Sequence, residues 1–256
     1  MIKTQRRGAL STTVTVKSDT GEVAPFTTVI NDNSAMSLGQ PFLWGYRIWR
    51  DERYLRAAIA LADFYAQAQF PEGGWSHTFV LKADGSVEPV GQTANFEEWV
   101  QSNGLRCLAA VYHLTGDERY KQAASKAGEV ILRAQDPSGW WPWGAAIGSE
   151  DKRPGYLKGP TLNDWNLNAC IGDCLVLYHM TGDERYLVPL RKHLAWLQSI
   201  PPEKKGWLWH AHRSWPAEEN QGKPSGYTKN LTRQFGAKLP SKEALAGLEC
   251  LDRFRP

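Results

Sequence analysis

Three acidic residues recur at one fixed interval along the chain, and together they could bind a cation. Asp32, Glu98 and Asp164 are equally spaced, and each is expected near the start of a helix. Acidic residues at that position are often simple caps, because they interact favourably with the helix dipole. If the three helices converge, their carboxylates would instead form a calcium site, which needs several oxygen ligands. The predicted metal ligands are Asp32, Asn33, Glu98 and Asp164.

Aromatic residues are unusually frequent, with twelve tryptophans and nine tyrosines. Large rings fill helical cores, and exposed rings stack on sugars. Trp75, Trp141 and Trp207 recur at the same interval as the acidic residues and are predicted to be structural. The tryptophans predicted to contact a sugar are Trp99, Trp143, Trp165 and Trp209. The predicted substrate contacts that follow the last of these are His210 and Arg213.

A basic cluster surrounds Tyr156 and consists of Lys152, Arg153 and Lys158. Such a run is often only a solvated surface. The functional hypothesis is that it recognises substrate carboxylates, for which the guanidinium fork is well shaped. Lys152 is assigned to substrate binding. Arg153, Lys158 and Tyr156, together with His77 from an earlier connection, are the predicted catalytic residues, because their side chains can move or hold protons.

Composition excludes several other functions. The net charge is only +3, with 30 basic and 27 acidic residues, whereas nucleic-acid binders show a strong basic excess. No segment approaches the roughly 20 apolar residues of a membrane span. The chain has no G-x-S-x-G, Walker or dinucleotide motif, and its four cysteines fit no zinc spacing. The exposed aromatic residues and the basic cluster instead predict an acidic oligosaccharide or polysaccharide as the partner, and a monomer is expected.

The beginning of the chain leaves the cellular location open. Residues 1–10 carry charges but no apolar segment, so no signal peptide is visible. An enzyme that degrades glycans is expected to be secreted or periplasmic if the native chain begins before Met1. Otherwise it would be cytoplasmic and act on imported fragments.

A threefold repeat organises the chain. The sequence Asp-Glu-Arg-Tyr begins at Asp51, Asp117 and Asp183, which defines the same interval again. In the second and third copies Thr-Gly precedes it, so that Gly ends one helix and Asp caps the next. Each copy predicts two helices. The first helices are expected at about residues 33–48, 98–114 and 165–180, and the second at about 51–69, 117–135 and 183–199.

Repeated helical hairpins must pack together to bury their apolar faces. We predict an all-α fold, an (α/α)₃ toroid in one domain spanning residues 1–256, with repeats at about 31–96, 97–162 and 163–213. A short N-terminal β-hairpin is expected from residues 12–17 and 22–28, and an irregular C-terminal tail wraps the domain from residue 214 to 256. The long connections after the second helices carry most of the candidate site residues.

Three segments resemble the pectate lyases of polysaccharide lyase family 10, also called pectic acid lyases. They are the Asn/Asp-rich stretch at residues 28–35, the Asp-Glu-Arg-Tyr turn, and Ala68-Gln-Phe-Pro-Glu-Gly-Gly-Trp75. The stretch Tyr156–Leu162 is also similar to the family's Tyr-x-x-Pro-Ser-Leu motif. The resemblance spans roughly residues 26–200, and Ala-Gln-Phe-Pro-Glu-Gly-Gly-Trp is its most specific segment.

The resemblance implies an (α/α)₃ toroid that performs calcium-assisted β-elimination on polygalacturonate. In that chemistry a cation neutralises the carboxylate beside C5, an arginine takes the C5 proton, and the C4 oxygen leaves. Arg153 is the nearest match to that arginine, although one extra residue precedes Tyr156 and one more precedes Pro160. Asp32 is the nearest match to a calcium-site aspartate.

The chain departs from the family at the site. Where the family has Phe-Asn-Asp-Asn-Ala, this chain has residues 93–98, and where the family has Gly-Gly-Trp-Pro-Gln it has Gly73–His77. The family's Ser-Gly-Ser-Glu-Ser is replaced by residues 163–166. Another uronate polymer, such as alginate or ulvan, is therefore a candidate substrate.

Three hypotheses for the function follow from the sequence. The first is a polysaccharide lyase that cleaves a uronate-containing glycan by β-elimination. The second is a glycoside hydrolase or sugar epimerase on the same toroid, with Asp32 and Asp164 as the two carboxylates that a hydrolase requires. The third is a carbohydrate-binding protein without catalytic activity.

Overall fold

Three consecutive helical hairpins form the structure, a computed structural model that describes residues 5–6, 9–10, 26–30, 34–82, 84–153 and 166–199. The described side chains are those of residues 30, 39–82, 84–153 and 169–199. The helices are α1 (Ser34–Trp49) and α2 (Glu52–Ala68), α3 (Val100–Thr115) and α4 (Glu118–Ala134), and α5 (Asn166–Thr181) and α6 (Val188–Ser199). The bounds of the first five helices agree with the predicted repeat to within two residues.

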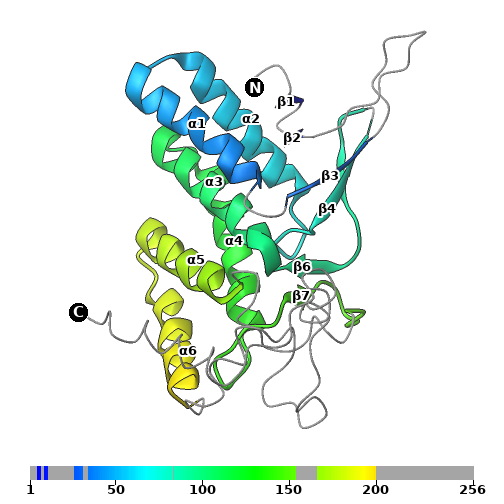
Figure 1. The fold of residues 1–256 in the computed structure, drawn as a ribbon, viewed down its shortest axis with the longest axis vertical. Coiled ribbons are helices and arrows are strands. Elements are labelled where there is room, and N and C mark those ends of the chain that lie inside the picture. Colours follow the sequence, from blue (N-terminus) through cyan, green and yellow to red (C-terminus); the bar gives the residue numbers. More distant parts are fainter. Residues whose placement is uncertain are drawn as a thin grey trace, which may run out of the picture.

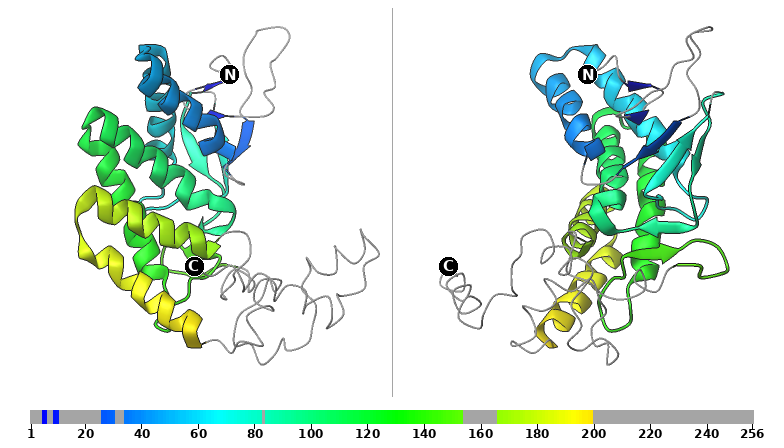
Figure 2. Two further views of the ribbon diagram at one scale, coloured as in Figure 1. Left: turned by 60° about the vertical axis from the view of Figure 1, so that its left-hand side comes forward. Right: turned by 45° about the vertical axis from the view of Figure 1, so that its right-hand side comes forward.

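The hairpins follow one another in a row, from α1 and α2 at one end to α5 and α6 at the other (Figures 1 and 2). In one layer α3 packs between α1 and α5, and α2 and α4 cover this layer from the other side. The architecture is that of the (α/α) toroid, which confirms the predicted fold class. No helix within the described ranges is long and apolar enough to cross a bilayer.

The short turn between the helices of each hairpin is the same in all three copies. The backbone N–H groups of Arg50, Gly116 and Gly182 close the first helix on the carbonyls of Tyr46, Tyr112 and Tyr178. All three residues adopt left-handed backbone, with φ of 54°, 70° and 72°. Glycine suits this conformation, and Arg50 shows that the first copy keeps it without one.

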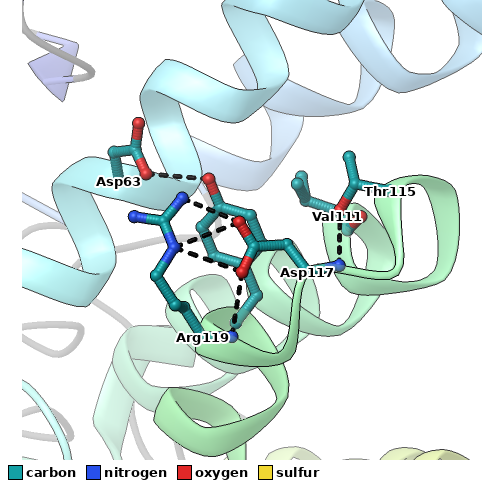
Figure 3. A network of polar contacts seen from close by, with 6 residues as sticks. Asp63, Val111, Thr115, Asp117 and Arg119 are labelled. Atoms are coloured by element: carbon teal, nitrogen blue, oxygen red, sulfur yellow. Dashed lines mark hydrogen bonds and ion pairs between the residues drawn. The ribbon is translucent and has the colours of Figure 1, made fainter.

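The aspartate of each Asp-Glu-Arg-Tyr motif caps the following helix, as predicted. Asp51, Asp117 and Asp183 accept hydrogen bonds from the backbone N–H two residues later, at 2.9, 3.0 and 2.9 Å. The arginine side chain of the same motif returns to the carboxylate, as Figure 3 shows for Arg119 and Asp117. These ion pairs are exposed and contribute little to stability.

The tyrosine of the motif connects neighbouring hairpins. The ring of Tyr120 is buried, and its hydroxyl donates a 2.8 Å hydrogen bond to Asp63 on α2. Burial of the ring raises the pKa of Tyr120, and the contact with Asp63 raises it further. In the third copy Tyr186 is buried in the same way, and Arg185 reaches Glu129, the counterpart of Asp63, at 3.0 Å.

The third copy departs from the predicted continuous second helix. Residues Glu184–Leu187 form a 3-10 turn (η4), and α6 begins only at Val188. Pro189 gives the physical reason, because its nitrogen has no hydrogen to donate to the preceding turn.

A second repeated contact binds each long connection to the helix that it follows. Trp75 and Trp141 are fully buried, and their indole N–H groups donate to the carbonyls of Tyr65 and Ile131 at 2.8 and 2.9 Å. These rings belong to the core, as their equivalent positions in the repeat predicted.

Two glutamines at the ends of the second helices extend this contact. Gln69 donates to the carbonyl of Ala123, and Gln135 donates to that of Pro189, at 2.8 and 2.9 Å. Each acceptor lies in the hairpin that follows, and the two acceptors occupy equivalent positions in successive copies of the repeat. The glutamines therefore fix the start of each long connection against its neighbour.

The long connections contain short strands that the sequence analysis did not predict. β3 (Phe26–Val29) pairs antiparallel with β4 (Thr78–Leu81), which pairs with β5 (Val87–Pro89). β6 (Thr93–Asn95) pairs with β7 (Gly144–Ala146) and so joins the first connection to the second. Strands this short carry too little alternation to be recognised in a sequence.

The N-terminal hairpin is only partly tested. Its first predicted strand, residues 12–17, and the C-terminal tail lie outside the described residues. Residues 26–28 do form a strand, as part of β3, and its described partner is β4. Two further short strands, β1 (Gln5–Arg6) and β2 (Ala9–Leu10), pair with each other near the N-terminus.

We expect Gly139→Ala to lower the free energy of unfolding more than Gly148→Ala. Both residues have left-handed φ, 110° and 85°, so each variant carries backbone strain of about 1 kcal/mol. Only at Gly139 would a Cβ atom overlap a backbone carbonyl, that of Lys192, whereas nothing lies within 4 Å at Gly148. Overpacking adds about 1–3 kcal/mol. Urea unfolding of the two variants measures the difference, and equal losses would contradict this close approach.

Candidate functional site

The side chains of His77 and Glu98 contact each other beside the start of α3. The Nε2 atom of His77 lies 3.0 Å from Oε2 of Glu98, and its Nδ1 atom lies 3.2 Å from the hydroxyl of Thr78. The two side chains are 31% and 32% exposed. The sequence analysis assigned His77 to catalysis and Glu98 to metal binding, and the structure brings the two together.

Buried amide groups hold the loop that carries His77. The side chain of Gln101 accepts from the N–H of Trp75 at 3.1 Å and donates to the carbonyls of Trp75 and Asn95 at 2.8 Å. The side chain of Asn95 accepts from the N–H of His77 at 3.2 Å. Gln101 and Asn95 are nearly inaccessible to solvent, so these bonds fix the backbone of His77 relative to α3.

Glu98 lies in an unfavourable backbone conformation. Its φ and ψ are 51° and 32°, and those of the next residue, Trp99, are 63° and 17°. Two successive left-handed residues that are not glycine cost roughly 1–2 kcal/mol each. Such strain persists only where the surrounding structure imposes it, and it concentrates at functional sites.

The carbonyl of Trp143 helps to impose this conformation. It accepts from the N–H groups of Phe96 and Glu97 at 2.7 and 3.3 Å, just before the strained residues. Trp143 is only 5% exposed, and its role in stacking on a sugar stays a prediction. The connection continues from Trp143 into β7, which pairs with β6.

A polar network that the sequence analysis missed links α3 to α5. Asp173 is fully buried, and it accepts from the hydroxyl of Ser102 at 2.6 Å and from Nε of Arg106 at 3.1 Å. Burial raises the pKa of Asp173 to about 6, although Arg106 and Ser102 act in the opposite direction. The guanidinium of Arg106 also lies over the half-buried ring of Trp99, with Cζ 4.8 Å from the ring centre.

Comparison of the repeats could have revealed this network. Asp173 occupies the position that Pro41 and Cys107 hold in the first two copies. A single acidic residue among apolar helix positions is the signal, because a buried carboxylate requires partners.

Arg153 is described, and its guanidinium is already bound. It contacts Asp151 through two nitrogens, at 2.8 and 2.9 Å, and Nη1 donates to the carbonyl of Gly144. Its side chain is 15% exposed. Its neighbour Lys152 forms an exposed ion pair with Glu150 at 3.2 Å. The role of Arg153 as a base stays a prediction.

The other predicted site residues lie outside the described residues. They are Asp32, Asn33, Tyr156, Lys158, Asp164, Trp165, Trp209, His210 and Arg213. Among the described residues no three His, Cys, Asp or Glu side chains are grouped as cation ligands, and Glu98 contacts His77 instead. The calcium site stays a prediction.

Similarity to known proteins is confined to the fold. No known protein family and no curated protein sequence matches the chain. Among solved structures, the cellobiose 2-epimerase from Spirochaeta thermophila aligns with a TM-score of 0.55 and 15% identity, over 77% of this chain and 49% of that one. The unsaturated glucuronyl hydrolase from Bacillus sp. GL1 aligns with a TM-score of 0.56 and 13% identity, over 82% and 58%.

A family 10 polysaccharide lyase from Cellvibrio cellulosa aligns less completely, with a TM-score of 0.45 and 19% identity, over 56% of this chain and 48% of that one. The chain spans about half the length of these structures. All three are carbohydrate-processing proteins with the (α/α) toroid fold. The likeness to the epimerase and to the glucuronyl hydrolase identifies the fold, and the reaction is left to be inferred from the site.

Protonation of Asp173 predicts a distinctive pH dependence. Its pKa is higher in the folded chain, about 6, than its usual 3.8, so the folded state takes up the proton first. Its contribution to stability therefore rises as the pH falls from about 6 to about 4, by roughly 3 kcal/mol if the full rise is realised. In Asp173→Asn this rise should disappear, as urea unfolding between pH 4 and pH 7 would show.

Asp117→Asn is a control with the opposite sign. Hydrogen bonds from Arg119 lower the pKa of Asp117, so its stabilising contribution is present above pH 4 and is lost only below it. If the two variants showed the same pH dependence, the burial of Asp173 would not be its cause.

Proposed function

We propose that this protein is an enzyme that cleaves an acidic, uronate-containing glycan by β-elimination, and that His77 and Glu98 carry the proton transfer. The observation that supports this most directly is the 3.0 Å contact between these side chains. Both remain partly open to solvent, and the second lies on strained backbone.

We propose distinct roles for the two side chains. An ionised Glu98 accepts a hydrogen bond from Nε2–H of His77, which leaves Nδ1 as the basic nitrogen of the ring. When Nδ1 takes up a proton, Glu98 stabilises the resulting imidazolium, as carboxylates do in other carboxylate–histidine pairs. The Thr78 hydroxyl, 3.2 Å from Nδ1, can rotate to allow this.

β-Elimination needs a base for the C5 proton, and His77 can supply it. Nδ1 would take the C5 proton, the C5–H electron pair would form the C4=C5 double bond, and the C4–O4 bond would break as its oxygen takes up a proton. We propose Tyr156 or Lys158 as the donor of that proton. Arg153 is less suitable as the base, because its guanidinium is bound to Asp151 and Gly144 and arginine has a pKa above about 12.

A sugar epimerase is the second candidate. The contact between His77 and Glu98 favours an epimerase over a glycoside hydrolase. Epimerisation also begins with removal of a proton from carbon, which one base can perform. Hydrolysis needs two carboxylates on either side of the bond, whereas the carboxylate of Glu98 faces a histidine.

We expect His77→Gln to reduce kcat by on the order of a hundredfold or more, because general-base catalysis contributes about 10²–10⁴. Glu98→Gln should also reduce kcat, since an amide cannot stabilise the imidazolium. Polygalacturonate, alginate and ulvan are the substrates to test, each with calcium and then with chelator, with the ultraviolet absorbance of the unsaturated product as the measurement.

Matched controls are available on the same scaffold. His179→Gln and Glu118→Gln alter exposed residues near the short turns, and they should retain full activity. New reducing ends without ultraviolet absorbance would replace the lyase proposal with a hydrolase. A changed sugar without new ends would indicate an epimerase, and binding without a product would indicate a carbohydrate-binding protein.

A further inference from the structure

One face of α3 is partly open, whereas the first turns of the helix are buried. Arg106 and Ala110 are partly exposed and His113 is exposed, whereas residues 100–105 are buried. The spacing of these three residues places them on one side of the helix. Trp99, which is also partly exposed, precedes the helix and lies against Arg106. Arg106 is the cation on this face that is nearest to the His77–Glu98 pair in sequence.

The repeat shows that Arg106 is a departure from symmetry. Its counterparts in the first and third copies are Gln40 and Gly172. At Gly172 a Cβ atom would overlap Nη2 of Arg106. The absence of a side chain at position 172 is therefore what allows the guanidinium of Arg106 to lie against α5.

Three neighbours hold this guanidinium in place. Asp173 binds Nε at 3.1 Å, Ser102 holds the other oxygen of Asp173 at 2.6 Å, and the Trp99 ring lies 4.8 Å from Cζ. Nη1 and Nη2 donate no hydrogen bond to any described residue, and the side chain is 33% exposed. The edge formed by these two nitrogens has the spacing that binds a carboxylate with two parallel hydrogen bonds.

We propose that Arg106 binds the carboxylate of an acidic sugar through Nη1 and Nη2, with Asp173 and Ser102 as positioning residues. Identification of the ligand as a uronate rests on the proposed function. Trp99, which lies against Arg106, directly follows Glu98 in the chain. A guanidinium on the C5 carboxylate would also neutralise its charge, which makes the C5 proton easier to remove.

Binding can be measured without turnover. Oligogalacturonates and alginate oligomers, each beside its carboxyl-reduced counterpart, would be titrated calorimetrically into the unaltered protein and its variants. The unaltered protein should prefer the charged form by on the order of tenfold to a hundredfold. Arg106→Gln should remove this preference and leave binding of the neutral form within about twofold, and Arg106→Lys should retain part of it.

Two further variants separate ligand binding from a structural role. Gly172→Ala keeps Arg106 but places a methyl group where Nη2 lies, and Asp173→Asn removes the ionic partner of Nε. Both should weaken binding of the charged form selectively. Arg47→Gln, which removes an exposed guanidinium from α1, should change nothing, and thermal unfolding verifies that each variant is folded.

The outcomes distinguish this proposal from the proposed function. An undiminished preference for the charged oligomer in both Arg106→Gln and Gly172→Ala would overturn the carboxylate site, even if His77→Gln were inactive. A preference that depends on Arg106, together with full activity of His77→Gln, would uphold the carboxylate site and reject the assigned base. No preference for the charged form in the unaltered protein would also overturn the carboxylate site.

Discussion

The close approach of each long connection to the next hairpin is the constraint on which the rest of the structure depends. At Gly73 and Gly139 a Cβ atom would overlap the carbonyl oxygens of Lys126 and Lys192, so only glycine fits at these two positions. A glutamine shortly before each glycine and a buried tryptophan shortly after it complete the contact. These contacts occupy equivalent positions in successive copies. The second hairpin therefore packs on the first in the same way as the third packs on the second, and this sets the spacing of the hairpins.

The first residue of the candidate site lies directly after this repeated contact in the chain. His77 follows Trp75 by two residues, and Trp143 follows Trp141 by two, so the same backbone path leads to a histidine in one copy and to a buried ring in the other. The carbonyl of Trp143 then supports the segment just before Glu98. The second copy thus contributes both Glu98 and its support, and this glutamate contacts His77 of the first copy.

Much of the fold could be predicted from the sequence, because its causes are local. The aspartate caps, the left-handed turns and the apolar periodicity each act within a few residues, and their recurrence removes ambiguity. The short strands, the burial of Trp143 and the left-handed backbone of Glu98 could not be predicted. Each depends on contacts between segments that are distant along the chain, such as the pairing of β6 with β7, which single-sequence patterns do not reveal.

Two polar clusters, His77 with Glu98 and Arg106 with Asp173, differ from the core in one physical property. Each contains a group whose conformation or burial raises the free energy of the folded state. The backbone of Glu98 and Trp99 is strained, and burial raises the pKa of Asp173 to about 6. A domain has only about 5–15 kcal/mol of net stability, so costs of a few kcal/mol are a substantial fraction of it. The repeated contacts between hairpins offset this unfavourable free energy, because they pack large rings and satisfy buried backbone groups at every junction. The symmetric positions therefore supply the stability, and the positions that break the symmetry, His77, Glu98, Arg106 and Asp173, depend on it for their geometry.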